Sequence, residues 1–328
     1  MEIREYRYTF LKFVKDWMLV FAMIAGASAY LIYHAIPSIH SAGPVLEVIA
    51  KKVQPLLLFC MLFLCFCKIE PRQMRPRRWQ LWLLLVQGGF FAVLAFILYL
   101  FPDISIRWGL ESFMLCMICP TATACAVVTG KLGGNMADVM TYTVLINLLV
   151  AVAVPLVVPL LYPGELSFWT ASLKIMGKVF PLLIMPCLAA WFVRYIMPRF
   201  HAWLMRFPDL AFYLWTVSLT LAMLMSTRAI VLNEDSAPAL LQIGTASLLA
   251  CAFQFWAGKA IGSRYGSRIT AGQALGQKNT VFSIWMGYTF LNPIVSVAGG
   301  FYTIWHNVFN SWQLYRKRIS GFQQRGVD

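Results

Sequence analysis

Polar and helix-breaking residues interrupt two of the predicted apolar helices near their centres. The first interruption lies in SFMLCMICPTATACAVVTGKLGG, where Pro120 removes a backbone hydrogen-bond donor. The second lies in TAGQALGQKNTVFSIWMGYTFL, where two amides and a lysine follow two glycines. Each break leaves free N–H groups at the start of a second half-helix, and two such ends together predict an anion site that needs no metal. The side chains expected at this site are Thr121, Thr123, Cys125, Gln277, Lys278 and Asn279.

Lys278 is the one basic residue predicted inside a span, where an unpaired charge costs about 3 kcal/mol on insertion scales. One interpretation pairs it with Asp138, so that either residue could take up and release a proton. Asp138 is the only acidic residue expected within these central helices. The alternative is that Asp138 caps the first turn of its own helix, where a carboxylate suits the helix dipole. Lys278 in turn could be a structural residue whose ammonium reaches the membrane interface.

Further candidate residues lie in other spans. His306 and Asn307 form part of a WHN sequence, and a histidine there could carry a proton or simply pack within the core. Cys116 and Cys119 are three residues apart on one helix and could bind a soft ion such as arsenite. The alternative is that these thiols are small packing groups beside a break.

Composition places all of these residues in a membrane protein. Of the 328 residues, 60% are hydrophobic and 12% are charged, against about 25% charged in soluble domains. All eight cysteines fall in apolar segments, which argues against a disulfide framework. No serine-nucleophile elbow, phosphate loop, HExxH sequence or pair of intramembrane carboxylates indicates an enzyme. We also expect no cofactor.

Hydropathy predicts an all-α protein with ten transmembrane helices. Their ranges are 17–36, 48–67, 79–101, 109–132, 136–161, 170–197, 210–228, 237–262, 270–291 and 294–315. With the N-terminus in the cytoplasm, twenty of the 27 Lys and Arg residues fall on the inside, six on the outside, and Lys278 within a span. This partition follows the positive-inside rule, so the net charge of +14 indicates contact with membrane lipid rather than with nucleic acid. We expect a multi-pass protein of the cell membrane, of the bacterial inner-membrane type, with both termini cytoplasmic.

The two breaks occupy matching places in the two halves of the chain. Each lies in the fourth of five helices, and an odd number of helices per half makes the halves opposite in orientation. This pattern is typical of inverted-repeat transporters. The predicted organisation is a cytoplasmic segment at 1–16, a first five-helix repeat at 17–161, a second at 162–315, and a basic cytoplasmic tail at 316–328. The segment 17–36 is expected to be a retained helix and not a signal peptide.

Four stretches resemble the bile acid:sodium symporter superfamily of ten-helix organic-anion transporters. They are PLLLFCMLFLCFCKIEP, CPTATACAVVTGKLGGN, GQKN and NPIVSVAGGFYTIWHNVFNS, of which the WHN sequence followed by a serine is the most specific. The resemblance implies a panel domain and a core domain, with the fourth and ninth helices crossing at their unwound centres. It further implies that substrate binds beside this crossing and that access alternates by an elevator or rocking motion.

The resemblance also implies that most sodium ligands of the family are replaced here. The Ser-Asn pair of the first site corresponds to Cys125 and Ala126, and a further serine corresponds to Val139. The glutamate shared by both sites corresponds to Ala274, and the glutamine of the second site to Lys278. Thr143 and Gln87 match the ligands that remain. We therefore expect no coupling to two sodium ions, with the Lys278 ammonium in the place of the second-site cation.

The predicted function is secondary transport of an organic anion, such as a monocarboxylate, a pantoate-like acid or a bile-acid conjugate. Two alternatives stay open at this point. One is an arsenite or metalloid exporter of the related ten-helix group, which would use the thiols. The other is a sensor built on a transporter fold that binds its ligand without net flux.

Overall fold

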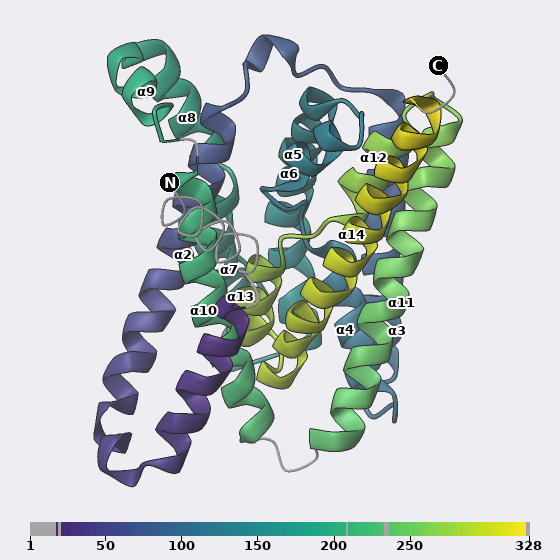
Figure 1. The fold of residues 1–328 in the computed structure, drawn as a ribbon. Coiled ribbons are helices and arrows are strands. Elements are labelled where there is room, and N and C mark those ends of the chain that lie inside the picture. Colours follow the sequence, from purple (N-terminus) through teal and green to yellow (C-terminus); the bar gives the residue numbers. More distant parts are fainter. Residues whose placement is uncertain (1–17, 19–20, 208, 233–235, 326–328) are drawn as a thin grey trace.

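The computed structural model describes residues 18, 21–207, 209–232 and 236–325 (Figure 1). Within these residues all regular secondary structure is helical. After a first helix through Phe21–Ala35, the elements in order are η1 (Pro37–Ala42), α2 (Gly43–Cys67), η2 (Pro71–Gln73), α3 (Arg78–Leu100), α4 (Arg107–Ile118), α5 (Cys125–Lys131), α6 (Met136–Leu161), α7 (Phe168–Leu183), α8 (Met185–Ile196), α9 (Pro198–Leu204), α10 (Leu210–Val231), α11 (Ser236–Ser263), α12 (Arg268–Gly276), α13 (Thr280–Phe290), η3 (Pro293–Ser296) and α14 (Val297–Arg325).

Five segments of the described chain are long and apolar enough to cross a membrane. They are Arg78–Leu100, Met136–Leu161, Phe168–Ile196, Leu210–Val231 and Ala237–Ser263, and Phe21–Ala35 and Lys52–Cys67 are shorter apolar helices. Large apolar side chains such as Leu85 and Phe96 are more than half exposed on α3. Such a surface is stable against lipid and not against water.

The expected spans at 109–132 and 270–291 are each divided into two helices. The first divides into α4 and α5 with residues 119–124 between them, and the second divides into α12 and α13 with residues 277–279 between them. The span expected at 170–197 also differs from the prediction, because Ile184 separates α7 from α8. Pro181 and Pro186 lie on either side of this point and remove backbone donors from the helix.

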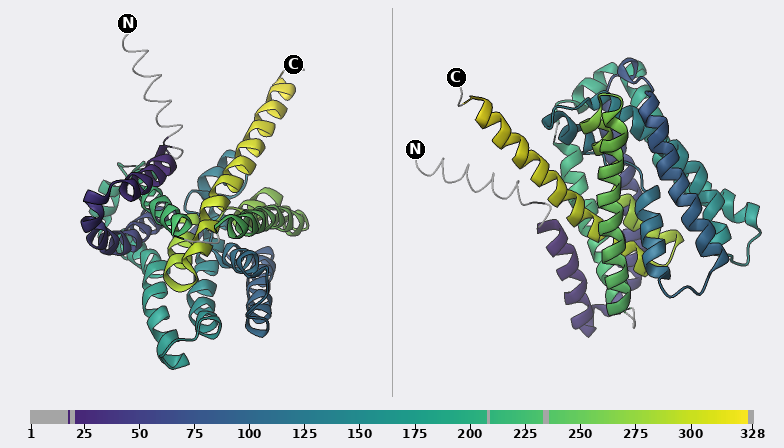
Figure 2. Two further views of the ribbon diagram at one scale, coloured as in Figure 1. Left: turned by 90° about the horizontal axis from the view of Figure 1, so that it is seen from below. Right: turned by 90° about the vertical axis from the view of Figure 1, so that its right-hand side faces the viewer.

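The last helix is longer than expected. We expected it to end at 315, whereas α14 continues to Arg325. Figure 2 shows the C-terminal part of α14 projecting away from the bundle in both views. Hydropathy marks only the apolar part of a helix. The polar residues that follow can remain helical although they do not pack against the bundle.

The helices form two packed groups that share one hydrophobic core. On one side α2 contacts α8 and α10, and on the other α11 contacts α4, α12 and α14. The interrupted helices lie in the centre, where α13 contacts α10, α14 and α4 (Figure 1). The buried core residues run continuously through both groups, so the divided helices are enclosed by protein. Irregular backbone at membrane depth is tolerated in that setting.

Three described segments that are expected at the cytoplasmic face lie together at one end of the bundle. In Figure 1, η2, α9 and the C-terminal end of α14 are at the upper end, whereas the turn between the first helix and α2 is at the lower end. The Lys317 ammonium donates to the Lys131 carbonyl at 3.0 Å, which ties α14 to the end of α5 there. In the described part of the chain, the basic segments around η2, α9 and the end of α14, which the positive-inside rule assigns to one side, therefore lie at one end of the fold.

Candidate functional site

The two interruptions lie against each other in the middle of the molecule. The Ala122 amide donates to the Gln277 carbonyl at 2.9 Å, and the Asn279 amide donates to the Pro120 carbonyl at 2.8 Å. Between these bonds Thr121 and Lys278 form an antiparallel bridge. Each interruption therefore supplies partners for backbone groups that the other interruption releases from its helix.

Three side chains from the first interruption also bond to the backbone around the second. The Thr121 hydroxyl donates to the Ala274 carbonyl at 2.8 Å, and the Cys119 thiol donates to the Asn279 carbonyl at 3.0 Å. The Cys125 thiol donates to the Gln273 carbonyl at 3.2 Å. Ala274 thus contributes its carbonyl to the contact between the two segments.

Thr121, which is predicted to offer its hydroxyl to a bound anion, is buried at the contact between the two interruptions. Its hydroxyl proton is donated within the protein and its side chain is 1% exposed. Thr123 is only half-buried, and its carbonyl accepts from the Cys65 thiol at 3.2 Å. Of the two threonines, Thr123 alone is placed to meet a solute.

Gln87 of α3 binds the end of α4. Its amide donates to the Ile118 carbonyl at 3.3 Å and to the Cys119 carbonyl at 2.9 Å, and its oxygen accepts from the Tyr142 hydroxyl at 2.8 Å. A helix that ends inside the protein has carbonyls without helical partners. Gln87 donates to two of these carbonyls, so the end of α4 accounts for a buried amide side chain at this position.

Lys278 extends its side chain to the same end of α4. It is 1% exposed, and its ammonium Nζ lies 3.4 Å from the Met117 carbonyl in the last turn. Its other electrostatic neighbours are four thiols, those of Cys116, Cys119, Cys125 and Cys251. No ion pair joins Lys278 to a carboxylate in the described part of the chain. The carbonyl end of a helix carries about half a negative charge, which favours a cation there.

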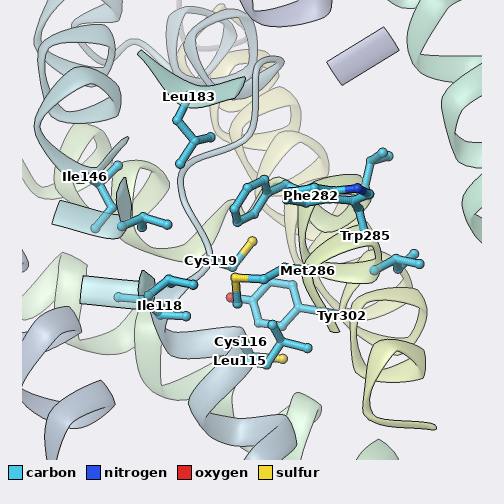
Figure 3. Close-up of a cluster of buried hydrophobic side chains, with 14 of the residues drawn as sticks. Leu115, Cys116, Ile118, Cys119, Ile146, Leu183, Phe282, Trp285, Met286 and Tyr302 are labelled. Carbon is cyan, nitrogen blue, oxygen red and sulfur yellow. The ribbon is translucent and has the colours of Figure 1, made fainter. Parts of the chain in front are cut away.

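The buried surroundings of the α4 end are mainly apolar. Figure 3 shows Cys116 and Cys119 in one cluster with Phe282 and Met286 of α13 and with Tyr302 of α14. The Tyr302 hydroxyl donates at 2.9 Å to the carbonyl of Gly276, which is the last residue of α12. A side chain therefore donates a hydrogen bond to a carbonyl at the end of α12, as Gln87 does at the end of α4.

Asn279 caps the helix that follows the second interruption. Its side-chain oxygen accepts from the Phe282 amide at 3.2 Å, which satisfies one free donor of α13. Its side-chain nitrogen is buried without a hydrogen-bond partner. Gln277 points its amide to the Gln273 oxygen at 2.8 Å, along α12. The Asn279 side-chain nitrogen is thus an uncommitted donor at the N-terminal end of α13.

Asp138 does not pair with Lys278, so that interpretation is wrong. Its carboxylate lies 3.3 Å from the Arg77 guanidinium, and its backbone amide donates to the Asn135 side chain at 3.1 Å. Asp138 is in the first turn of α6, as the alternative interpretation had it. Thr143 donates to the Val139 carbonyl of its own helix at 3.0 Å.

The WHN residues lie on α14. His306 is 4% exposed with its ring 5.7 Å from the Tyr302 ring, and its Nδ1 atom has no hydrogen-bond partner. Asn307 is half-buried and donates to the Thr303 carbonyl of its own helix at 2.8 Å. Neither side chain bonds to the two interruptions.

Sequence reasoning missed a second buried acid. Glu111 of α4 is 1% exposed and pairs with Arg107 at 2.6 Å, so Asp138 is not the only acidic residue in the central helices. Glu111 follows Arg107 by four positions on one helix face, a spacing that could have indicated the pair. Gln254 was missed as well, although a lone amide in CAFQFW is a recognisable signal. Its amide lies between the Cys116 carbonyl at 3.3 Å and the Tyr302 hydroxyl at 3.1 Å.

The thiols near the interruptions are engaged with backbone oxygens. Cys119 and Cys125 each donate to a carbonyl, as given above. In the described residues no group of three or more His, Cys, Asp or Glu side chains could hold a metal ion. All eight cysteines are free thiols.

The sequence matches one family of known proteins. The model of the sodium bile acid symporter family matches residues 55–234, which is more than half of the chain and includes the first interruption. No curated protein matches the sequence. The family consists of membrane transporters rather than enzymes, and together with the apolar helices it identifies a multi-pass membrane protein. The chain belongs to the sodium bile acid symporter family.

Proposed function

We propose that this protein is a secondary active transporter of a small organic anion, with the Lys278 ammonium in the place of a coupling cation. The observation that carries the proposal is the position of Lys278 Nζ, buried against the Met117 carbonyl at the C-terminal end of α4. In transporters with discontinuous helices, such carbonyl ends hold the coupling Na⁺. A fixed ammonium supplies the same charge without an ion being bound.

The geometry of the interruptions supports an organic anion as the substrate. The α13 N-terminal end carries partial positive charge, and the Asn279 side-chain nitrogen beside it is a donor without a partner. Thr123 is half-buried near the start of α5. With the Lys278 charge behind them, these donors suit a carboxylate, as found in monocarboxylates, pantoate-like acids or bile-acid conjugates.

The proposed architecture is that of two inverted five-helix repeats, at 17–161 and 162–315. The interruptions at 119–124 and 277–279 then occupy the fourth helix of each repeat, and α4–α5 and α12–α13 form the crossing. During alternating access, the interrupted helices would move as a unit relative to α2, α8 and α10. The proposed location is the cell membrane with both termini in the cytoplasm.

The first test is uptake by proteoliposomes that contain the purified protein. We expect counterflow of at least one labelled carboxylate, at equal rates in sodium and in choline buffer. Counterflow that requires sodium would contradict the fixed-charge role of Lys278. Ligand binding in a thermal-shift screen without any counterflow would instead indicate a sensor.

The second test replaces the ammonium itself. Lys278→Ala should reduce carboxylate uptake to background, because the negative end of α4 then lacks its cation, and added methylammonium should partly restore it. Lys259→Ala on α11 is the control, since this lysine is half-buried and its ammonium lies 5.8 Å from the centre of the Phe309 ring. Full uptake by Lys278→Ala would overturn the proposal. Size-exclusion profiles of both variants establish that they fold.

A further inference from the structure

A cleft lies away from the two interruptions, between α10, α13 and η3. It has a volume of about 410 Å³ and is lined by Arg228, Tyr288 and Asn292 together with apolar residues. Tyr288 is nine positions beyond Asn279, so along the helix the cleft is roughly 13 Å from the start of α13. The same helix therefore joins the cleft to the candidate site.

Arg228 is the charged residue of this cleft. Its guanidinium pairs with the Glu47 carboxylate of α2 at 3.0 Å and donates to the Tyr288 hydroxyl of α13. Tyr30 of the first helix is a further electrostatic neighbour. One guanidinium on α10 thus contacts the first helix, α2 and α13, and links the group formed by α2 and α10 to an interrupted helix.

Arg228 lines the cleft, and its partner Glu47 is a partly exposed residue of α2. The two side chains are 32% and 29% exposed, so each can be hydrated when the pair separates. An ion pair with this exposure contributes little stability, about 0–1 kcal/mol. A second carboxylate that enters the cleft can therefore exchange with Glu47 at a small cost. A planar guanidinium binds a carboxylate through two parallel N–H groups, which makes arginine the suited partner.

We propose that this cleft is a carboxylate-binding subsite in which Arg228 holds the carboxylate of the entering anion. When no anion is bound, Glu47 pairs with the Arg228 guanidinium, and the Tyr288 hydroxyl holds the guanidinium in its orientation. The inference rests on the proposed function, because it names the group by which the same substrate is first held. It adds a site about 13 Å from the crossing, on the side of the bundle that the positive-inside rule makes extracellular.

The test measures whether a carboxylate covers Arg228 in the purified full-length protein. Phenylglyoxal modifies accessible guanidinium groups, and the adduct on Arg228 is quantified by peptide mass spectrometry with increasing benzoate. We expect benzoate to slow modification of Arg228 several-fold, while benzyl alcohol, which lacks the carboxylate, has no effect. Arg264 is exposed at the opposite end of the bundle and is the internal control, whose rate stays constant.

The role of Glu47 is tested in the same assay. Glu47→Gln removes the internal competitor, so Arg228 should react faster without ligand and half-protection should need several-fold less benzoate. An Arg228 rate that is unchanged by benzoate overturns the subsite. Protection that is identical in Glu47→Gln and wild type overturns the exchange with Glu47.

Transport separates this inference from the proposed function. Arg228→Gln should raise the KM for a transported carboxylate about tenfold with kcat nearly unchanged, as for the loss of one charge-assisted hydrogen bond. Arg264→Gln, which removes the same charge from the other end, should leave both constants unchanged. If wild type transports no carboxylate but benzoate still protects Arg228, the proposed function fails and the subsite stands. If transport occurs and benzoate gives no protection, the subsite fails and the proposed function stands.

Discussion

Two equally buried threonines differ in the hydrogen bonds that their hydroxyl groups make. Thr121 and Thr143 are both 1% exposed. Thr143 donates to the carbonyl of Val139, four residues earlier on α6, which also receives a helical N–H. Thr121 donates to the Ala274 carbonyl on another helix, near the end of α12. Only the second bond joins separate parts of the chain.

This contrast predicts different costs for the same substitution. Thr121→Val should lower the free energy of unfolding by about 1 kcal/mol, because the bond between the two interruptions is lost in a buried place. Thr143→Val, the matched control, should change it by less than about 0.5 kcal/mol, because the Val139 carbonyl keeps its helical partner. Thermal unfolding of both variants in detergent measures the difference. Equal stability of the two variants would show that the Thr121 bond does not hold the segments together.

At the scale of elements, α11 and α12 depend on glycine for their close approach. Gly258 and Gly262 on α11 are four positions apart and face α12. A Cβ on Gly258 would lie 2.6 Å from the Ala271 carbonyl oxygen, and one on Gly262 would lie 2.6 Å from the Ala271 Cβ. Small residues at this spacing allow helix backbones to approach closely in membranes. Because α12 runs directly into the second interruption, its position also fixes Lys278.

Gly258→Ala should therefore move α12 and damage both stability and transport. The new Cβ meets backbone atoms, which cannot rotate away, and overpacking of this kind costs about 1–3 kcal/mol. Gly177→Ala on α7 is the control, since no atom lies within 4 Å of its added Cβ and alanine favours a helix. We expect a lower unfolding temperature only for Gly258→Ala. A wild-type temperature for this variant would mean that α11 and α12 can separate freely.

At the scale of the whole molecule, the distribution of bases predicts the orientation of the protein in the membrane. Segments rich in Lys and Arg, such as η2 and the end of α14, lie at one end of the bundle, whereas the turn between α3 and α4 lies at the other (Figure 1). The positive-inside rule applies to short loops of this kind. The protein should accordingly insert with η2 and the end of α14 in the cytoplasm.

Reporter fusions test this orientation. Alkaline phosphatase fused after Asp103, between α3 and α4, should be active, because this loop is expected outside the cytoplasm. The same reporter fused after Arg72 in η2 should be inactive, and green fluorescent protein at the C-terminus should fluoresce. The reverse pattern would show that the charge partition does not set the topology.

The amino-acid sequence by itself determined the bounds of α6 and the places where two apolar helices are interrupted. The bounds of α6 agree with the predicted 136–161, and Pro120 and the Gln277–Asn279 run mark the two interruptions. These features are local, since they depend on hydropathy within a window or on a backbone donor missing at one residue. The family resemblance could be recognised for the same reason, because two of its four stretches, CPTATACAVVTGKLGGN and GQKN, lie at these breaks.

The tertiary structure alone decided which polar groups meet. Asp138 pairs with Arg77, 61 positions away, and Arg228 reaches from α10 to Glu47 on α2. Spacing along a helix does not encode such pairs, because each buried polar group takes whichever partner the packing of the helices brings within reach. For Lys278, the sequence predicted an intramembrane charge, and only the fold put its ammonium against the carbonyl end of α4.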